Sequence, residues 1–300
     1  MTRRDLLVAA SAAAASPATP APTPRFVKGI CSVIFPKDQT RPEAFAQAKS
    51  AGFDAVEVAI GNDFPLDISH DDARRFGDAA HKAGITIATI WASQPLSANP
   101  LNSDDPAARA RGAEAIRTAI RIAKEMNCGA LLLYPGRVGN GAKFQCSYQL
   151  TWERFTAELR KLVPDAERAQ VFLNPENVWN KFLLSPLEMR TFIDQFQSPW
   201  FQSHFDTGNV MQFGYPEDWI LTLGSRIKRI HIKDYKLSNR DEQGHFAGLL
   251  EGDVNWKAVM AALVKTGYNG PLSPEIGYDS KQPDQLKDVS KQLDTILSMA

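Results

Sequence analysis

Four short segments of the chain run from apolar residues into a side chain that can bind a metal ion or move a proton. These segments end on Glu176, Asp206, His231 and Glu275. Buried strands of a parallel sheet are almost continuously hydrophobic, so a polar residue at the end of such a run marks a strand that opens into a site. Three carboxylates and one imidazole suit a hard divalent ion better than a structural Zn²⁺ site, which prefers Cys and His. The sequence therefore predicts a divalent-metal site, for which we favour Mn²⁺ over Mg²⁺, Co²⁺ or Zn²⁺.

The expected metal site predicts proton transfer on a sugar. An octahedral ion with four protein ligands keeps two open positions, which suit the carbonyl and neighbouring hydroxyl oxygens of a keto-sugar. Acting as a Lewis acid, the ion would stabilise the enediolate that forms when the adjacent proton is lost. Glu176 and Glu275 are the expected catalytic residues, one removing the proton and the other returning it. A single carboxylate at a strand end is more often a surface residue, but four such residues at matching positions favour a ligand set.

Further polar and aromatic residues close to these strand ends are expected to contact the substrate or to support the metal ligands. The sequence alone leaves both roles open for Glu57. Trp91 is expected to pack against the C–H face of a sugar, although core packing explains it nearly as well. Asp234 is expected to orient a ligand, and Lys236 to meet a substrate oxyanion. The full set of expected substrate-binding residues is Glu57, Trp91, Asn209, Lys233, Asp234 and Lys236.

The elements that must position these residues alternate between short apolar runs and amphipathic segments. Strands are predicted over residues 26–35, 53–60, 85–91 and 129–134 and before each of the four strand-end residues. Helices are predicted over residues 41–51, 71–83, 107–126, 152–169, 186–196, 216–223, 254–266 and 285–299. Eight consecutive βα units favour an α/β fold with a single (β/α)8 TIM barrel, whose functional residues lie at the carboxyl ends of its strands. An open doubly wound sheet is the alternative, but no Gly-rich phosphate loop follows the first strand.

Two segments are expected to lie outside this regular pattern. Residues 93–106 form a long Ser-, Asn- and Pro-rich loop that could cover the site as a lid. Residues 1–24 begin with a twin-arginine pair and continue through an Ala-rich run to a Pro-rich joint, as in a twin-arginine export signal. The apolar stretch is too short for a membrane span, and a disordered tail is the alternative. We therefore expect residues 25–300 to form the barrel, and the protein to be periplasmic or secreted.

Composition narrows the choice of partners. The 300 residues carry a formal net charge of +0, which argues against the basic surface that nucleic-acid binding requires. Cys31, Cys128 and Cys146 form no CxxC pair, so a disulfide framework is not expected. We expect a small-molecule sugar as the partner, with no nucleic acid and no membrane-spanning segment, and leave a homodimer open.

Several motifs together resemble the sugar phosphate isomerase/epimerase family with a xylose isomerase-like barrel. The resemblance covers essentially everything after the signal and is carried by Phe53-Asp-Ala-Val-Glu57, Asn174-Pro-Glu176-Asn177, Phe205-Asp206-Thr-Gly-Asn209, His231-Ile-Lys-Asp-Tyr-Lys236, the turn from Leu249 to Trp256, and Pro274-Glu275. It implies a metal at the four strand-end residues and proton transfer by the two glutamates, as in the ketose 3-epimerases. Two positions depart from those epimerases, because Asn209 replaces a histidine and Lys236 stands in place of an arginine.

The favoured function is therefore a metal-dependent isomerase or epimerase that acts on a non-phosphorylated sugar or keto-sugar through an enediolate. Export argues against a sugar phosphate of central metabolism. A lyase or dehydratase acting on a keto-sugar or keto-glycoside is the first alternative, because the same enediolate can expel a leaving group, as in an inosose dehydratase. An endonuclease IV-like nuclease would need a basic DNA-binding face. A non-catalytic carbohydrate-binding barrel would have little use for paired glutamates.

Overall fold

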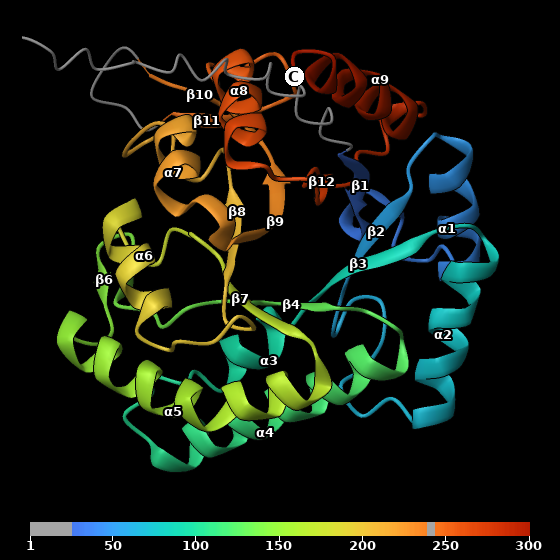
Figure 1. Cartoon of the computed structure of the whole chain (residues 1–300). Coiled ribbons are helices and arrows are strands. Elements are labelled where there is room, and N and C mark those ends of the chain that lie inside the picture. Colours follow the sequence, from blue (N-terminus) through green and yellow to red (C-terminus); the bar gives the residue numbers. More distant parts are fainter. Residues whose placement is uncertain (1–25, 239–243) are drawn as a thin grey trace, which may run out of the picture.

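The apolar runs of the chain form a ring of parallel strands. The computed structural model describes residues 26–238 and 244–300 (Figure 1). Its eight long-range strands are β1 (Val27–Cys31), β2 (Ala55–Ala59), β3 (Thr86–Trp91), β4 (Ala130–Leu133), β7 (Phe172–Pro175), β8 (Ser203–Asp206), β9 (Ile227–Ile232) and β12 (Pro271–Pro274). They pair in parallel in the order β7-β4-β3-β2-β1-β12-β9-β8. The two outer strands meet through bridges between Leu173 and Phe201 and between Glu176 and His204, which nearly close the barrel.

Helices cross between successive strands and surround the barrel, as Figure 1 shows. Parallel neighbours require such crossovers, because each connection must return the chain to the same end of the sheet. The helices are α1 (Arg41–Ser50), α2 (His70–Lys82), α3 (Ser93–Ala98), α4 (Pro106–Glu125), α5 (Tyr148–Ala169), α6 (Pro186–Asp194), α7 (Pro216–Leu223), α8 (Trp256–Thr266) and α9 (Gln285–Leu297). The predicted single (β/α)8 TIM barrel is confirmed.

Helix ends follow the capping chemistry of the sequence. The side chain of Ser185 accepts a hydrogen bond from the Glu188 amide at the start of α6, and proline occupies its first turn. The chain leaves α1 at Gly52 (φ +91°) and α2 at Gly84 (φ +73°). Positive φ at these positions favours glycine and ends both helices where the sequence predicted.

Three predicted segments differ from the structure by more than two residues. Residues 93–106 are not a continuous loop, because α3 lies within them and α4 begins at Pro106, where the Asp105 side chain caps it. The first strand ends at Cys31 and gives way to a 3₁₀ turn, Ser32–Ile34, instead of continuing to residue 35. Helix α5 begins four residues earlier than predicted, because Ser147 caps its first turn.

Two antiparallel hairpins on the strand-to-helix loops were not predicted. One pairs β5 (Gly139–Asn140) with β6 (Lys143–Phe144), and the other pairs β10 (Asp234–Lys236) with β11 (His245–Ala247). Strands of two or three residues are too short to show the alternation on which a sequence prediction depends.

The export signal predicted for residues 1–24 lies outside the described residues, so the structure does not test it. Among the helices of residues 26–238 and 244–300, none has the length and apolar character needed to cross a membrane.

The buried part of the strands contains an unusual number of polar side chains. Glu57, Thr89, Asn174, His204 and Ser273 all have zero solvent exposure. Barrel interiors are normally filled by branched apolar residues, and a buried polar group is unfavourable unless it is hydrogen-bonded. This polar interior indicates that the functional site lies within the barrel.

Candidate active site

The four predicted metal ligands come together at the carboxyl ends of neighbouring strands. One ligand atom from each of them lies within 4.8 Å of the others, and the residues are Glu176, Asp206, His231 and Glu275. Asp206 ends β8, His231 lies near the end of β9, and the two glutamates directly follow β7 and β12. The parallel register explains this convergence, because residues far apart in the chain reach the same rim of the barrel.

A positive side chain lies among the carboxylates. His231 Nδ1 is 3.0 Å from Glu176 Oε1, 3.1 Å from Glu275 Oε2 and 3.7 Å from Asp206 Oδ2. The ammonium of Lys233 is 2.9 Å from Asp206 Oδ2 and 2.6 Å from Glu275 Oε2. Asp206 and His231 are almost fully buried, whereas the Glu275 side chain is 25% exposed. Glu275 therefore has the most direct access to a substrate entering from the mouth.

The donor set fits a divalent cation. Three carboxylate oxygens and one imidazole nitrogen converge from four different strands, which matches the hard ligands of Mn²⁺ or Mg²⁺. The negative charge of the carboxylates is balanced only in part, by Lys233 and by His231. Since buried charges are strongly unfavourable unless they are paired or bind a metal, the cluster has the composition of a cation site.

Two asparagines hold Asp206 in place. The Asn177 side chain accepts a hydrogen bond from the Asp206 amide at 2.8 Å and donates one to the Asp206 carbonyl at 2.9 Å. Asn209 donates its backbone N–H to Asp206 Oδ1 at 2.8 Å and its side-chain amide to the Asn177 carbonyl at 2.9 Å. These contacts leave Asp206 Oδ2 facing the cluster. The sequence reasoning missed the role of Asn177, and it expected Asn209 to bind substrate rather than to orient Asp206.

Glu57 and Trp91 approach His231 from the other side of its ring. Glu57 is fully buried, its Oε2 lies 3.2 Å from His231 Nε2, and it accepts a hydrogen bond from Trp91 Nε1 at 2.9 Å. The Trp91 ring is tilted against the imidazole, with the ring centroids 5.2 Å apart. The buried position of Glu57 favours the supporting role over direct contact with substrate.

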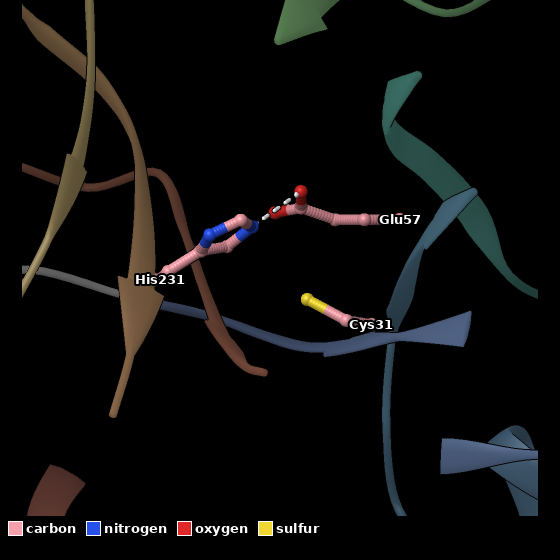
Figure 2. A group of neighbouring side chains, drawn as sticks. All are labelled: Cys31, Glu57 and His231. Atoms are coloured by element: carbon pink, nitrogen blue, oxygen red, sulfur yellow. Dashed lines mark hydrogen bonds and ion pairs between the residues drawn. The ribbon is translucent and has the colours of Figure 1, made fainter. Parts of the chain in front are cut away.

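Cys31 completes a second, deeper group with Glu57 and His231, shown in Figure 2. A neutral imidazole binds an ion through one nitrogen and keeps its proton on the other. An ion held at Nδ1 by the upper cluster would therefore leave Nε2–H to donate to Glu57. The two groups share His231, and the upper one offers more ligands and greater access.

His204 also lies against this deeper group. Its ring centroid is 4.0 Å from that of His231, and it is fully buried. Burial and the nearby charge of His231 hold the pKa of His204 well below its usual range, so the ring is neutral. It packs inside the barrel, against the His231 ring.

The pKa values of Glu176 and Glu275 differ in opposite directions from the usual value of a glutamate. Burial raises the pKa of Glu176 to about 7, despite the opposing charge of His231. Burial also acts to raise the pKa of Glu275, but the positive charges of His231 and Lys233 bring it down to about 2. One carboxyl is thus prone to hold a proton while its neighbour stays ionised, a pairing typical of acid–base catalysis.

Asp234 and Lys236 are engaged elsewhere. The carboxylate of Asp234 is buried and accepts hydrogen bonds from the backbone amides of Tyr235, Leu250 and Val254 and from Trp256 Nε1. Lys236 is half exposed and pairs with Asp253 at 2.5 Å. Asp234 was expected to orient a metal ligand and Lys236 to meet a substrate oxyanion. Instead, Asp234 stabilises the turn before α8, and Lys236 pairs with a carboxylate outside the ligand cluster.

A pocket of about 450 Å³ lies beside the cluster. Its lining includes Tyr134 and Trp179, which place it next to the end of β7. The backbone N–H of Glu176 donates to the carbonyl of Leu133, the residue before Tyr134. Burial and the charges of Glu176 and Glu275 raise the pKa of Tyr134 to about 12, so its hydroxyl is neutral.

The sequence of this barrel matches a known family model. Residues 45–296 match the model described as the xylose isomerase-like TIM barrel. The chain belongs to the xylose isomerase-like TIM barrel family. Within this family, L-ribulose-5-phosphate 3-epimerase UlaE of Escherichia coli O1:K1 / APEC is 28% identical over 278 residues, covering 89% of this chain and 93% of that protein.

Solved structures share the fold at lower identity. D-psicose 3-epimerase, solved in the presence of D-fructose, has a TM-score of 0.75 at 17% identity, covering 91% of this chain and 97% of its own. L-ribulose 3-epimerase has a TM-score of 0.74 at 21% identity, covering 91% and 95%. At these identities the likeness concerns the fold alone.

Proposed function

We propose that this member of the xylose isomerase-like TIM barrel family is a metal-dependent sugar epimerase. The observation that carries the proposal is the convergence of two electrostatically distinct glutamates, Glu176 and Glu275, on one cluster with Asp206 and His231. The names of its relatives, which are 3-epimerases of ketoses or their phosphates, support a sugar as substrate and inversion at one carbon as the reaction.

Four residues would hold the metal: Glu176, Asp206, His231 and Glu275. When bound, a divalent ion supplies Lewis-acid polarisation of a carbonyl oxygen. The protein contributes the orientation of the ligands. Asn177 and Asn209 fix Asp206, and Glu57 accepts the Nε2 proton of His231, so Nδ1 is available on the side that faces the carboxylates.

The proton transfer follows from the two glutamates. Glu275 is the more exposed and is held ionised by Lys233, so it removes the proton from the carbon next to the substrate carbonyl. The electron pair of the broken C–H bond then forms an enediolate. Glu176, whose burial raises its pKa to about 7, takes up a proton from solvent and gives it to the opposite face of that carbon. A second turnover requires the two carboxyls to return to their starting protonation states through solvent.

Four finer points remain proposals. We favour Mn²⁺ as the ion, because the ligands are hard and mostly oxygen. Export of the protein to the periplasm would follow from the signal expected at residues 1–24 and would place it apart from the sugar phosphates of central metabolism. For the same reason we favour a sugar that carries no phosphate. A homodimer stays a prediction.

Solvent-deuterium incorporation tests the mechanism directly. The Mn²⁺-loaded protein is incubated in D₂O with a panel of ketoses and 3-keto-glucosides and followed by NMR, alongside Glu275→Gln and Glu176→Gln. We expect deuterium at a single carbon with the carbon skeleton retained, and loss of that exchange in Glu275→Gln. Arg75→Gln, on the exposed face of α2, serves as the control that leaves exchange unchanged.

The other outcomes identify other functions. Deuterium incorporation with loss of a substituent would identify a lyase or dehydratase acting through the same enediolate. Binding of sugars without exchange in any substrate, while the metal is bound, would contradict proton transfer and favour a carbohydrate-binding role. Exchange that persists in both glutamine variants would show that these carboxyls are not the acid and base.

A further inference from the structure

The pocket beside the metal-ligand cluster has a second polar end. Tyr134 and Trp179 form the wall nearest Glu176, and Arg137 lines the same pocket three residues after Tyr134. The volume of about 450 Å³ is in the range of small-molecule sites. A sugar whose reacting carbon lies at the cluster therefore has room to extend along the pocket toward Arg137.

Arg137 carries a charge that the protein itself does not neutralise. Within the described part of the chain, its guanidinium forms no ion pair and no hydrogen bond, and the residue as a whole is partly buried. The acidic residue that shares the pocket lining, Asp104, is already paired with Arg154. Among the residues that line the pocket, Arg137 is therefore the charged residue without a partner of opposite charge.

The backbone beside Arg137 adds further donors. The carbonyls of Gly136 and Arg137 are fixed by the side-chain amides of Asn180 and Asn102, each at 2.9 Å. The N–H groups of Gly136 and Arg137 have no acceptor among the residues that the structure describes. Gly136 is a buried residue and Arg137 a partly buried one. Their unpaired N–H groups, next to a guanidinium without a carboxylate partner, are donors available to an anionic group in the pocket.

We propose that this end of the pocket binds an anionic group at the far end of the sugar, either a carboxylate or a phosphate monoester. The inference rests on the proposed epimerase function and narrows its substrate to an anionic sugar. A guanidinium presents parallel N–H donors that match two oxygens of either group. Carboxylate and phosphate are thus recognised by the same donors. A comparison of the turnover of a carboxylated and a phosphorylated sugar distinguishes them.

Three ketoses that differ only at the terminal carbon test the proposal: the neutral sugar, its terminal phosphate ester and its terminal carboxylic acid. We compare kcat/KM in the wild type, Arg137→Gln, Arg137→Lys and the surface control Arg75→Gln.

Hydrogen bonds to charged groups are strong enough that the wild type should prefer one anionic substrate over the neutral sugar by at least about tenfold in kcat/KM. Arg137→Gln should lose that preference and keep its activity on the neutral sugar, whereas Arg75→Gln should match the wild type. The preferred anion identifies the group.

Two results would overturn the proposal. One is a wild type that turns over all three sugars equally well, and the other is an Arg137→Gln variant that loses activity on all three in parallel. If none of the sugars exchanges deuterium, the epimerase function fails, and the Arg137 site is then judged by calorimetric titration with inorganic phosphate. Binding that is lost in Arg137→Gln supports the site independently of turnover, and binding that is equal in the variant, or absent from the wild type, refutes it.

Discussion

The Nε2 atom of His231 lies 3.2 Å from Glu57 Oε2 (Figure 2). The other ring nitrogen, Nδ1, faces the carboxylates of the ligand cluster and lies 3.0 Å from Glu176 Oε1. Glu57 is itself held by the indole N–H of Trp91. Because a neutral imidazole has one proton, a carboxylate at Nε2 favours the tautomer whose Nδ1 lone pair is free. Glu57 is therefore a positioning residue for the metal site, acting through His231 from the closed side of the barrel.

Replacing Glu57 with glutamine should weaken metal binding. The amide keeps the shape but can also present its NH₂ to Nε2, which would favour the wrong tautomer. We expect the Kd for Mn²⁺ to rise about 10–100-fold, the usual effect of losing such a partner. Calorimetric titration with Mn²⁺ measures it, with the exposed Glu114→Gln on α4 as a control. An unchanged Kd in Glu57→Gln would show that Glu57 does not position His231.

Lys233 and Lys236 make a matched pair for testing the charge balance of the cluster. Lys233 is 15% exposed and contacts Asp206 and Glu275, whereas Lys236 is 48% exposed and contacts Asp253. Removing one partner of a buried ion pair leaves an uncompensated charge and costs about 3–5 kcal/mol, so the chelator-treated Lys233→Met variant should be strongly destabilised.

Lys236→Met should leave the stability almost unchanged, because an exposed pair is screened by solvent. Urea unfolding of both variants, with excess chelator and then with saturating Mn²⁺, measures the difference. We expect Mn²⁺ to restore much of the stability of Lys233→Met, because the ion supplies the missing positive charge. Equal losses in the two lysine variants would contradict the assignment.

Asp234 should affect stability and leave metal affinity alone. Its carboxylate accepts four hydrogen bonds that tie the turn before α8 to β10, and a Cβ on Gly252 would lie 2.0 Å from its Oδ1. In Asp234→Asn one oxygen becomes a donor facing other donors, which should cost about 1–3 kcal/mol. Thermal unfolding measures the loss, and a Mn²⁺ titration should give the wild-type Kd. A higher Kd for Mn²⁺ without loss of stability would show that Asp234 supports the metal site and not the turn.

The sequence was sufficient for the barrel and for the convergence of the ligand cluster. Both depend on strong periodic signals, since apolar runs that end on Glu176, Asp206, His231 and Glu275 repeat in register with the strands. It was less successful with side chains just beyond the strand ends. Asp234 and Lys236 follow the same strand as His231, and only the unpredicted β10–β11 hairpin turns them toward the α8 turn and the surface.

The supporting residues were harder to predict for a different reason. Glu57 is separated from His231 by 174 positions and Asn177 from Asp206 by 29. Nothing local in the sequence distinguishes a buried carboxylate that supports an imidazole from one that meets a substrate. The pairing depends on barrel closure, which brings β2 and β9 together across the interior.

Metal binding should release protons, and the amount should depend on pH. Burial raises the pKa of Glu176 to about 7, so at pH 6 this carboxyl is mostly protonated before metal binds, although it must be ionised to act as a ligand. Burial acts to lower the pKa of His231, but Cys31 and the neighbouring carboxylates raise it well above its usual value, and Nδ1 must lose its proton before it can bind the metal. Mn²⁺ affinity should therefore rise with pH between 5 and 7, by up to about tenfold per pH unit for each proton displaced.

Calorimetry at pH 6 in buffers of different ionisation enthalpy counts the protons released on metal binding, and Glu176→Gln should release about one proton fewer than the wild type. Equal proton release by the two proteins would mean that Glu176 is already ionised before the metal binds, which would contradict its raised pKa.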